Sequence, residues 1–107
     1  MNESQAVSKL VRELNKHGYF WKSSDRFRAG IPDIVGCVAG RFAGIEAKVD
    51  YNTPSAIQVH TLKQITECGG YAKVVTYSNR RKAWFYMGKD HSFSEVVKAI
   101  IGDISEN

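Results

Sequence analysis

Two segments decide the fold of this chain: Gly30–Asp33, with the sequence GIPD, and Phe42–Val49, with the sequence FAGIEAKV. The first segment leads into a β-rich run, and the second is an apolar strand that carries one acid and one lysine. Ala39-Gly40-Arg41 lies between them and is short enough to close a hairpin. We therefore expect two adjacent antiparallel strands, with one acid where the first begins and another inside its neighbour.

Side chains alternate along a strand, so Glu46 and Lys48 lie on one face and Ala47 points away. Asp33 and Glu46 can then converge on one divalent cation, because Mg²⁺ prefers hard oxygen ligands and keeps several waters. We expect Mg²⁺ or Mn²⁺ to be held by Asp33, Glu46 and the backbone carbonyl of Ala47. The Lys48 ammonium group can orient an attacking water and offset charge on phosphorus. This pattern predicts a metal-dependent nuclease.

An ordinary strand with a solvated Glu/Lys pair is the other interpretation of the same residues. Apart from that pair, Phe42–Val49 consists of apolar residues and one glycine. An acid and a lysine on one face of a short apolar strand favour a cleft over a random surface. Catalysis is the preferred interpretation.

Hydrophobic periodicity predicts a mixed α/β sheet flanked by helices. Strands are expected at Tyr19–Lys22, Asp33–Val38, Phe42–Val49, Tyr71–Tyr77 and Ala83–Met87. Helices are expected in the first segment up to Gly18, from Pro54 or Ser55 to Gly69, and over Phe93–Ile104. The second helix has two possible start signals: Pro54 at its first position, or a capping box of Ser55 and Gln58.

The composition is that of one globular domain, which we place over residues 1–107. The sequence has neither an apolar run of about 20 residues nor a signal pattern, so a cytoplasmic protein without a membrane partner is expected (host cytoplasm if viral). Cys37 and Cys68 have no paired spacing, which predicts buried thiols rather than a zinc site or a disulfide.

Charge is unevenly distributed along the chain. Residues 90–107 carry four acids and one lysine, a net −3, which leaves +7 on the first 89 residues out of a total of +4. Such a bias favours a polyanionic partner, with DNA as the expected one. Arg26 and Arg28 before the motif and the cluster Arg80, Arg81 and Lys82 are candidate phosphate contacts, although exposed arginines are often only solvated.

The motifs resemble those of a known family. Gly30-Ile31-Pro32-Asp33, Glu46-Ala47-Lys48, Gln58 and the Gly69-Gly70 helix end are similar in order and spacing to the virus-type replication-repair nuclease (VRR-NUC) family of the PD-(D/E)xK superfamily. The resemblance implies a restriction-endonuclease-like fold and hydrolysis of DNA phosphodiesters. Small stand-alone members, viral and bacterial, resemble Holliday junction resolvases that work as homodimers, so the resemblance implies branched DNA as substrate and a second copy as partner.

The resemblance also implies a catalytic glutamate on the first helix and a glutamine on the second. Helical steps of about 100° place Glu3 near the apolar stripe and Glu13 away from it, so Glu3 is the candidate, in support of a metal or its water. An acid that favours the helix dipole is the alternative for Glu3. Gln58 has two compatible roles: it can cap the helix, or it can contact phosphate beside Lys48.

Other features carry less weight. The aromatic runs Tyr19-Phe20-Trp21 and Trp84-Phe85-Tyr86 are predicted to be core rather than platforms for base stacking. The Phe93–Ile104 stripe can cover its own sheet or serve a dimer interface. The same chemistry on flaps, ends or single strands is a further possibility, as is a non-catalytic nucleic-acid-binding module. Retention of the full acid–acid–lysine set argues against the latter.

Overall fold

Six strands form one mixed sheet in a computed structural model that describes residues 1–23 and 28–106. In sheet order they are β1 (Tyr19–Lys22), β2 (Ile34–Val38), β3 (Arg41–Val49), β4 (Tyr71–Ser78), β5 (Ala83–Tyr86) and β6 (Lys89–His91). Of the strand pairs that the structure describes, β3–β4 is parallel and the other four are antiparallel. A parallel pair needs a crossover connection, and a helix between β3 and β4 supplies it.

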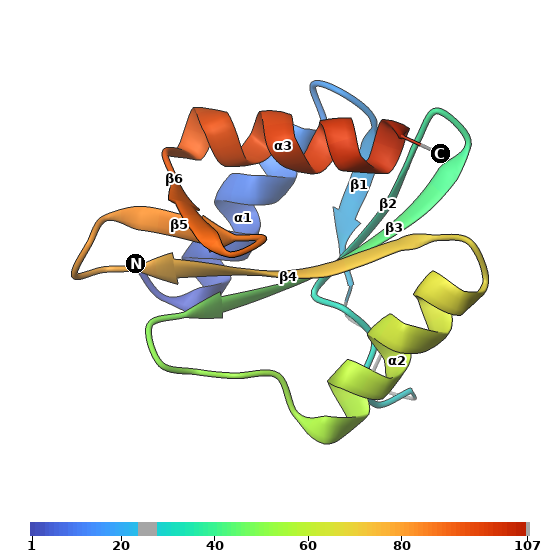
Figure 1. Cartoon of the computed structure of the whole chain (residues 1–107), viewed down its shortest axis with the longest axis horizontal. Coiled ribbons are helices and arrows are strands. Elements are labelled where there is room, and N and C mark those ends of the chain that lie inside the picture. Colours follow the sequence, from blue (N-terminus) through green and yellow to red (C-terminus); the bar gives the residue numbers. More distant parts are fainter. Residues whose placement is uncertain (24–27, 107) are drawn as a thin grey trace.

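Within residues 1–23 and 28–106, three helices flank the sheet. The helices α1 (Glu3–Leu14) and α3 (Phe93–Ser105) cover one face, whereas α2 (Ala56–Glu67) lies on the other (Figure 1). The odd-numbered residues of β3 from Ala43 to Val49 are buried in the core with α1 and α3. Strand alternation therefore directs Glu46 and Lys48 to the opposite face, where α2 lies.

A capping box starts each helix. The Ser55 hydroxyl accepts the Gln58 N–H while the Gln58 side chain accepts the Ser55 N–H, so α2 begins after Ser55 and Pro54 precedes the cap. Asn2 with Gln5 caps α1 in the same way, and Ser92 with Glu95 caps α3. Each box satisfies helix N–H groups that have no partner within the helix. Of the two start signals for α2, the capping box is the one used.

The last short strand was not expected from the sequence. Met87 and Gly88 have φ values of 51° and 83°, the pair of left-handed conformations that closes a two-residue hairpin. The strand that follows, Lys89–His91, is polar and has no apolar alternation to reveal it. It pairs with β5 because the turn fixes its position, which sequence periodicity does not record.

Several side chains predicted to be buried are exposed. Phe20, Trp84 and Tyr86 belong to the core, but their neighbours Tyr19, Trp21 and Phe85 point to the other side of the sheet and are exposed. Strand alternation explains the difference, because every second side chain of a strand points to the face that α1 and α3 cover. The prediction of buried thiols was also wrong: Cys37 alternates outward on β2, and Cys68 lies at the C-cap of α2.

The apolar stripe of α3 packs on its own sheet. Val96, Val97, Ile100 and Ile104 are all buried in the core cluster. The stripe therefore covers the sheet instead of offering a dimer surface. Among the described residues, no helix combines the length and the apolar character needed to cross a bilayer.

Candidate active site

Glu46 is a carboxylate enclosed by protein. Its side chain has 0% exposure, and neither carboxylate oxygen has a hydrogen-bond partner among the described residues. Burial, followed by the neighbouring Asp33 carboxyl group, raises the pKa of Glu46 to about 8, while the charge of Lys48 opposes that rise. A buried carboxylate without a partner is costly, so this position is a candidate ligand site.

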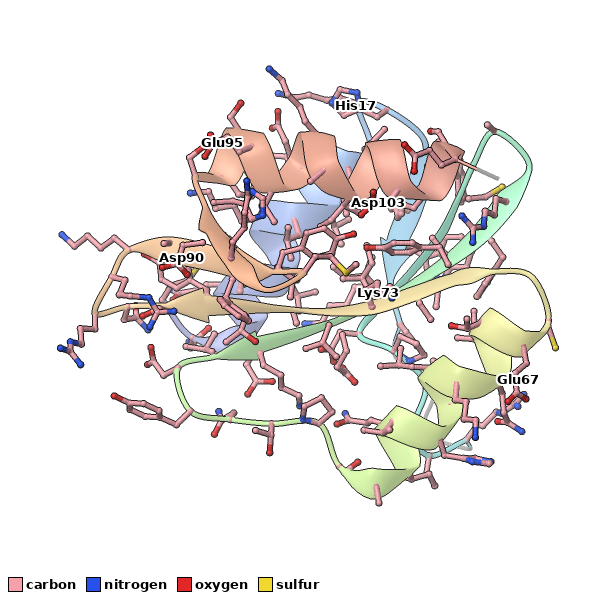
Figure 2. All side chains as sticks on the ribbon, viewed as in Figure 1. His17, Glu67, Lys73, Asp90, Glu95 and Asp103 are labelled. Carbon is pink, nitrogen blue, oxygen red and sulfur yellow. The ribbon has the colours of Figure 1, made fainter. Side chains whose placement is uncertain are left out.

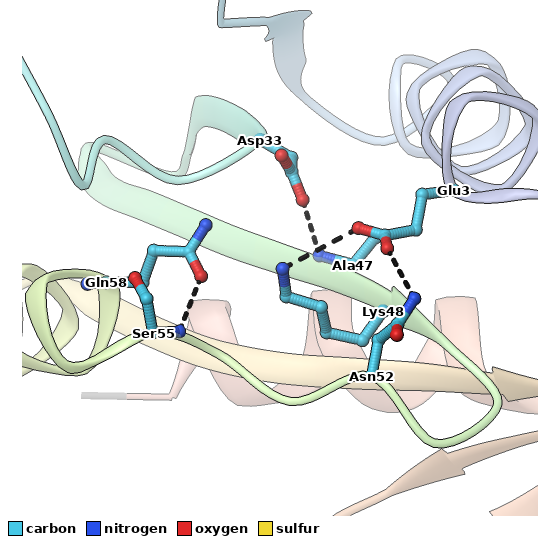
Figure 3. Close-up of polar contacts among 7 residues, drawn as sticks. All are labelled: Glu3, Asp33, Ala47, Lys48, Asn52, Ser55 and Gln58. Carbon is cyan, nitrogen blue, oxygen red and sulfur yellow. Dashed lines mark hydrogen bonds and ion pairs between the residues drawn. The ribbon is translucent and has the colours of Figure 1, made fainter.

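Asp33 lies one residue before β2, at the point where the hairpin opens. Its Oδ2 atom accepts a hydrogen bond of 3.0 Å from the backbone N–H of Ala47 (Figure 3). The pairing of β2 with β3 ends at Ile34 and Ile45, so the Ala47 backbone lies past the last ladder pair. In an extended strand the N–H and C=O of one residue point to the same side. The Ala47 carbonyl therefore faces the side on which Asp33 lies.

Lys48 forms an ion pair with a residue of α1, which is far away in the sequence. Its Nζ atom lies 3.6 Å from Oε1 of Glu3, and its side chain is only 12% exposed. The other oxygen of Glu3 accepts a hydrogen bond of 3.0 Å from the Asn52 amide (Figure 3). Glu13, the rejected candidate on the same helix, pairs instead with Lys16. The structure thus brings Glu3, Lys48 and Asn52 together.

Gln58 lies on the first turn of α2, on the side of β3 that carries Lys48 (Figure 3). Its side-chain oxygen serves the capping box with Ser55. The amide nitrogen has no protein hydrogen bond among the described residues, which leaves a donor at this helix end. The capping role is confirmed, and contact with a phosphate stays a prediction.

The basic candidates are dispersed. Arg28 lies by the C-terminal end of α2 with Gln64 and Cys68, away from the cap that carries Gln58. Arg80, Arg81 and Lys82 follow β4 and are exposed. Arg81 forms two hydrogen bonds with Asp90, at 2.9 and 3.2 Å. Arg26 lies outside the described residues.

The loop after β3 is anchored by contacts that no motif indicates. Asp50 has a φ of 57°, and its carboxylate accepts hydrogen bonds of 2.8 and 3.0 Å from the backbone and side-chain N–H groups of Asn79. Those hydrogen bonds hold the pKa of Asp50 below its usual range. Asn79 also bonds the amino group and the carbonyl of Met1. This network ties the start of α1, and with it Glu3, to the end of β3.

The residues present fit a divalent cation. Within the part of the chain that the structure describes, the two oxygens of Glu46 lack partners, the Asp33 carboxyl group is near them, and the Ala47 carbonyl faces the side on which Asp33 lies. Within the described part of the chain, no group of three or more His, Cys, Asp or Glu side chains gathers to form a fuller metal cage. Two carboxylates and a carbonyl suit Mg²⁺, which keeps several of its waters.

Comparison with known proteins gives a fold. Neither a family model nor a curated protein matches the sequence. A solved VRR-NUC domain superposes with a TM-score of 0.62 at 22% identity, covering 94% of this chain and 96% of that one. The Holliday junction resolvase Hjc of Archaeoglobus fulgidus gives 0.56 at 26% identity, covering 75% and 70%. The chain therefore has the restriction-endonuclease-like fold of PD-(D/E)xK nucleases, and the predicted likeness to a VRR-NUC domain is confirmed.

Proposed function

We propose that this protein is a DNA endonuclease dependent on Mg²⁺ or Mn²⁺, with its active site at Asp33, Glu46 and Lys48. The observation that carries the proposal is the Glu46 carboxylate, which is buried and has no hydrogen-bond partner among the described residues, with Asp33 and Lys48 near enough to influence its charge. A merely structural carboxylate in that position would be paired or replaced by an apolar residue. The nuclease fold of the chain is consistent with this chemistry.

Each residue has a separate task in the proposed reaction. Asp33, Glu46 and the Ala47 carbonyl hold the cation, which when bound stabilises negative charge on the phosphate. The Asp33 hydrogen bond to the Ala47 N–H keeps that carboxylate at the end of the hairpin. Lys48 donates from its ammonium group to the attacking water and offsets charge on phosphorus. Glu3 orients the ammonium group, and Asn52 orients Glu3.

The substrate we favour is branched DNA, cut by a homodimer. One protein of similar structure is the Holliday junction resolvase Hjc, and the chain covers 70% of it. Symmetric resolution of a four-way junction needs two cuts, and a twofold dimer supplies two related sites. The second candidate is the same chemistry on flaps, ends or single strands, which the exposed rings of Tyr51 and Phe85 near Lys48 favour.

The test is a cleavage assay with four matched substrates: four-way junction, flap, blunt duplex and single strand. Each is incubated with Mg²⁺, with Mn²⁺ or with chelator, beside the Asp33→Ala and Lys48→Ala variants. We expect cleavage only with metal, and a loss of about 100-fold or more in either variant. Paired symmetric nicks in the junction support the resolvase role.

Metal binding is measured separately from cleavage. Mg²⁺ should raise the melting temperature of the wild type and of Lys48→Ala, but not that of Asp33→Ala. A wild type that binds DNA yet cuts none of the four substrates with either metal would overturn the enzyme proposal. A light-scattering mass near one chain of 12.0 kDa at the assay concentration would overturn the dimer.

A further inference from the structure

An open cavity adjoins the candidate active site on the sheet face that carries Lys48, over β4 and β5. Its volume is about 390 Å³, and it is lined by Asp50, Tyr51, Asn52, Thr53, Thr76, Arg81 and Phe85. The Asp50 carboxylate is engaged by Asn79. We call it the Tyr51 cavity. Its size falls within the range of about 300–1,000 Å³ that is usual for small-ligand sites. The reaction proposed above uses only Asn52 from this set.

The sheet register connects the Tyr51 cavity to Lys48. Lys48 of β3 pairs with Thr76 of β4, and Thr76 pairs with Phe85 of β5. Residues that pair directly lie on the same face of a sheet, so the three side chains form one row. Phe85 is two strands from Lys48, or roughly 10 Å along the sheet. A nucleotide next to a phosphate at Lys48 is therefore within reach of this cavity.

Two aromatic rings are exposed here. Tyr51 is 90% exposed, and Phe85 is 43% exposed in the middle strand of a three-stranded segment. The loop that carries Tyr51 is anchored: the Asp50 N–H bonds the Tyr77 carbonyl at 2.8 Å, and the Asn52 N–H bonds the Val49 carbonyl at 3.2 Å. An aromatic ring on an anchored loop can stack on a ligand with little loss of conformational entropy.

The chemistry of the lining favours a nucleotide over an apolar protein segment. The Arg81 guanidinium lines the cavity and is paired with Asp90, so the net positive charge of this turn comes from its neighbours Arg80 and Lys82. Asp90, at the end of the molecule opposite to Glu67 (Figure 2), accepts two hydrogen bonds from Arg81. Hydroxyl and amide groups of Thr53, Thr76 and Asn52 complete the wall. Aromatic faces combined with cations are the elements that bind unpaired nucleotides.

We propose that the Tyr51 cavity binds an unpaired base within two nucleotides of the cleaved phosphate, with Phe85 and Tyr51 as stacking surfaces. Bases inside a duplex are stacked on both sides, whereas a base in a flap, in a single strand or at a branch point offers a free face. The proposal rests on the active site proposed above, and it names the substrate class of that site as DNA with unpaired bases beside the cut.

The test separates binding from chemistry by measuring affinity in chelator. Fluorescence anisotropy compares a flap DNA with a blunt duplex of the same length, for the wild type and for Tyr51→Ala and Phe85→Leu. Each variant should weaken flap binding by about 5–150-fold, the range for loss of one stacked base, and change duplex binding less than twofold. Phe85→Tyr keeps an aromatic ring at this position and should bind the flap DNA as tightly as the wild type does.

Phe42→Leu is the matched control, because Phe42 is a strand residue of similar exposure (46%) that lines a different cavity with Arg28. It should bind both DNAs as the wild type does. Melting temperatures show whether Phe85→Leu folds, and Tyr51→Ala alters a side chain that is almost fully exposed, so one variant remains informative if the other is unstable.

Equal affinity loss on flap and duplex, no loss on either, or a wild type that binds no DNA would each overturn the stacking proposal. A change in oligomeric mass in the Tyr51→Ala variant would also overturn the stacking proposal, because it would show that the cavity is a contact between protein copies. The two proposals fail in different ways. A wild type that cleaves DNA while the variants keep full flap affinity refutes only the stacking site. Flap-specific losses in a protein that never cleaves refute only the nuclease.

Discussion

Glu3, on the first turn of α1, lies 3.6 Å from the ammonium nitrogen of Lys48 in β3. The two residues are far apart in sequence, and the contact orients the only side chain we expect to act on the attacking water. Glu3 is 37% exposed, so the pair stabilises the fold little. We therefore assign the contact a role in positioning rather than in stability.

Replacing Glu3 by Gln tests that assignment. Cleavage should fall by about tenfold because Lys48 loses its orienting charge, while the free energy of unfolding changes by less than about 1 kcal/mol. Affinity for Mg²⁺, measured by calorimetry, should stay unchanged. A large drop in metal affinity would show instead that Glu3 is a metal ligand. Glu13→Gln is the matched control and should leave cleavage unaffected.

Replacing Lys48 by Met should lower the cleavage rate by a factor of about 100 or more. The variant should still bind DNA and metal. Lys48→Arg should not restore the rate, because a planar guanidinium cannot occupy the position of a compact ammonium group. Single-turnover kinetics with saturating enzyme provides the measurement. Residual activity above one tenth of the wild type in Lys48→Met would contradict the proposed role.

The ionisation of Glu46 makes stability depend on pH. Its pKa is raised from 4.5 to about 8 in the folded chain, so the folded state binds more protons than the unfolded state between those values. The contribution of Glu46 to the free energy of unfolding is therefore greatest below pH 4.5 and falls as pH rises toward 8. Urea denaturation in chelator at several pH values should show this decline.

Glu46→Gln removes the ionisation, so the decline should be much smaller in this variant. The variant should be more stable than the wild type at pH 8 by up to several kcal/mol, because each pKa unit corresponds to about 1.4 kcal/mol. Mg²⁺ should stabilise the wild type more strongly as pH rises, because binding displaces the Glu46 proton. A parallel pH dependence in the two proteins would refute this account.

Gln58 offers a test that separates capping from catalysis. Glutamate at this position completes a capping box as well as glutamine does, so Gln58→Glu should keep the stability of α2. It replaces an amide donor by a negative charge, so cleavage should fall at least tenfold if the amide contacts phosphate. Ser55→Ala is the control for the cap and should cost about 1 kcal/mol with little effect on the rate. Wild-type activity in Gln58→Glu would leave Gln58 as a cap alone.

Local patterns predicted most of the fold. The Ala39-Gly40 turn, the alternation in β3 and the Ser55–Gln58 box each act within a few residues, and the structure contains all three. The polar strand β6 was missed because its position depends on a turn rather than on apolar spacing. The exposure of Phe85 was also missed, although strand alternation beside the buried Trp84 and Tyr86 carries that information.

What the sequence determined by itself is the pair of acids, the lysine, and the face that Glu46 and Lys48 share, because strand alternation is a property of the backbone. The tertiary structure alone decided that Glu46 is sealed from water, that Glu3 reaches Lys48, and that Thr76 and Phe85 continue the row. These relationships join residues on separate elements, and they depend on how α1, the sheet and the loop after β3 pack together. Burial and long-range contact are properties of that packing.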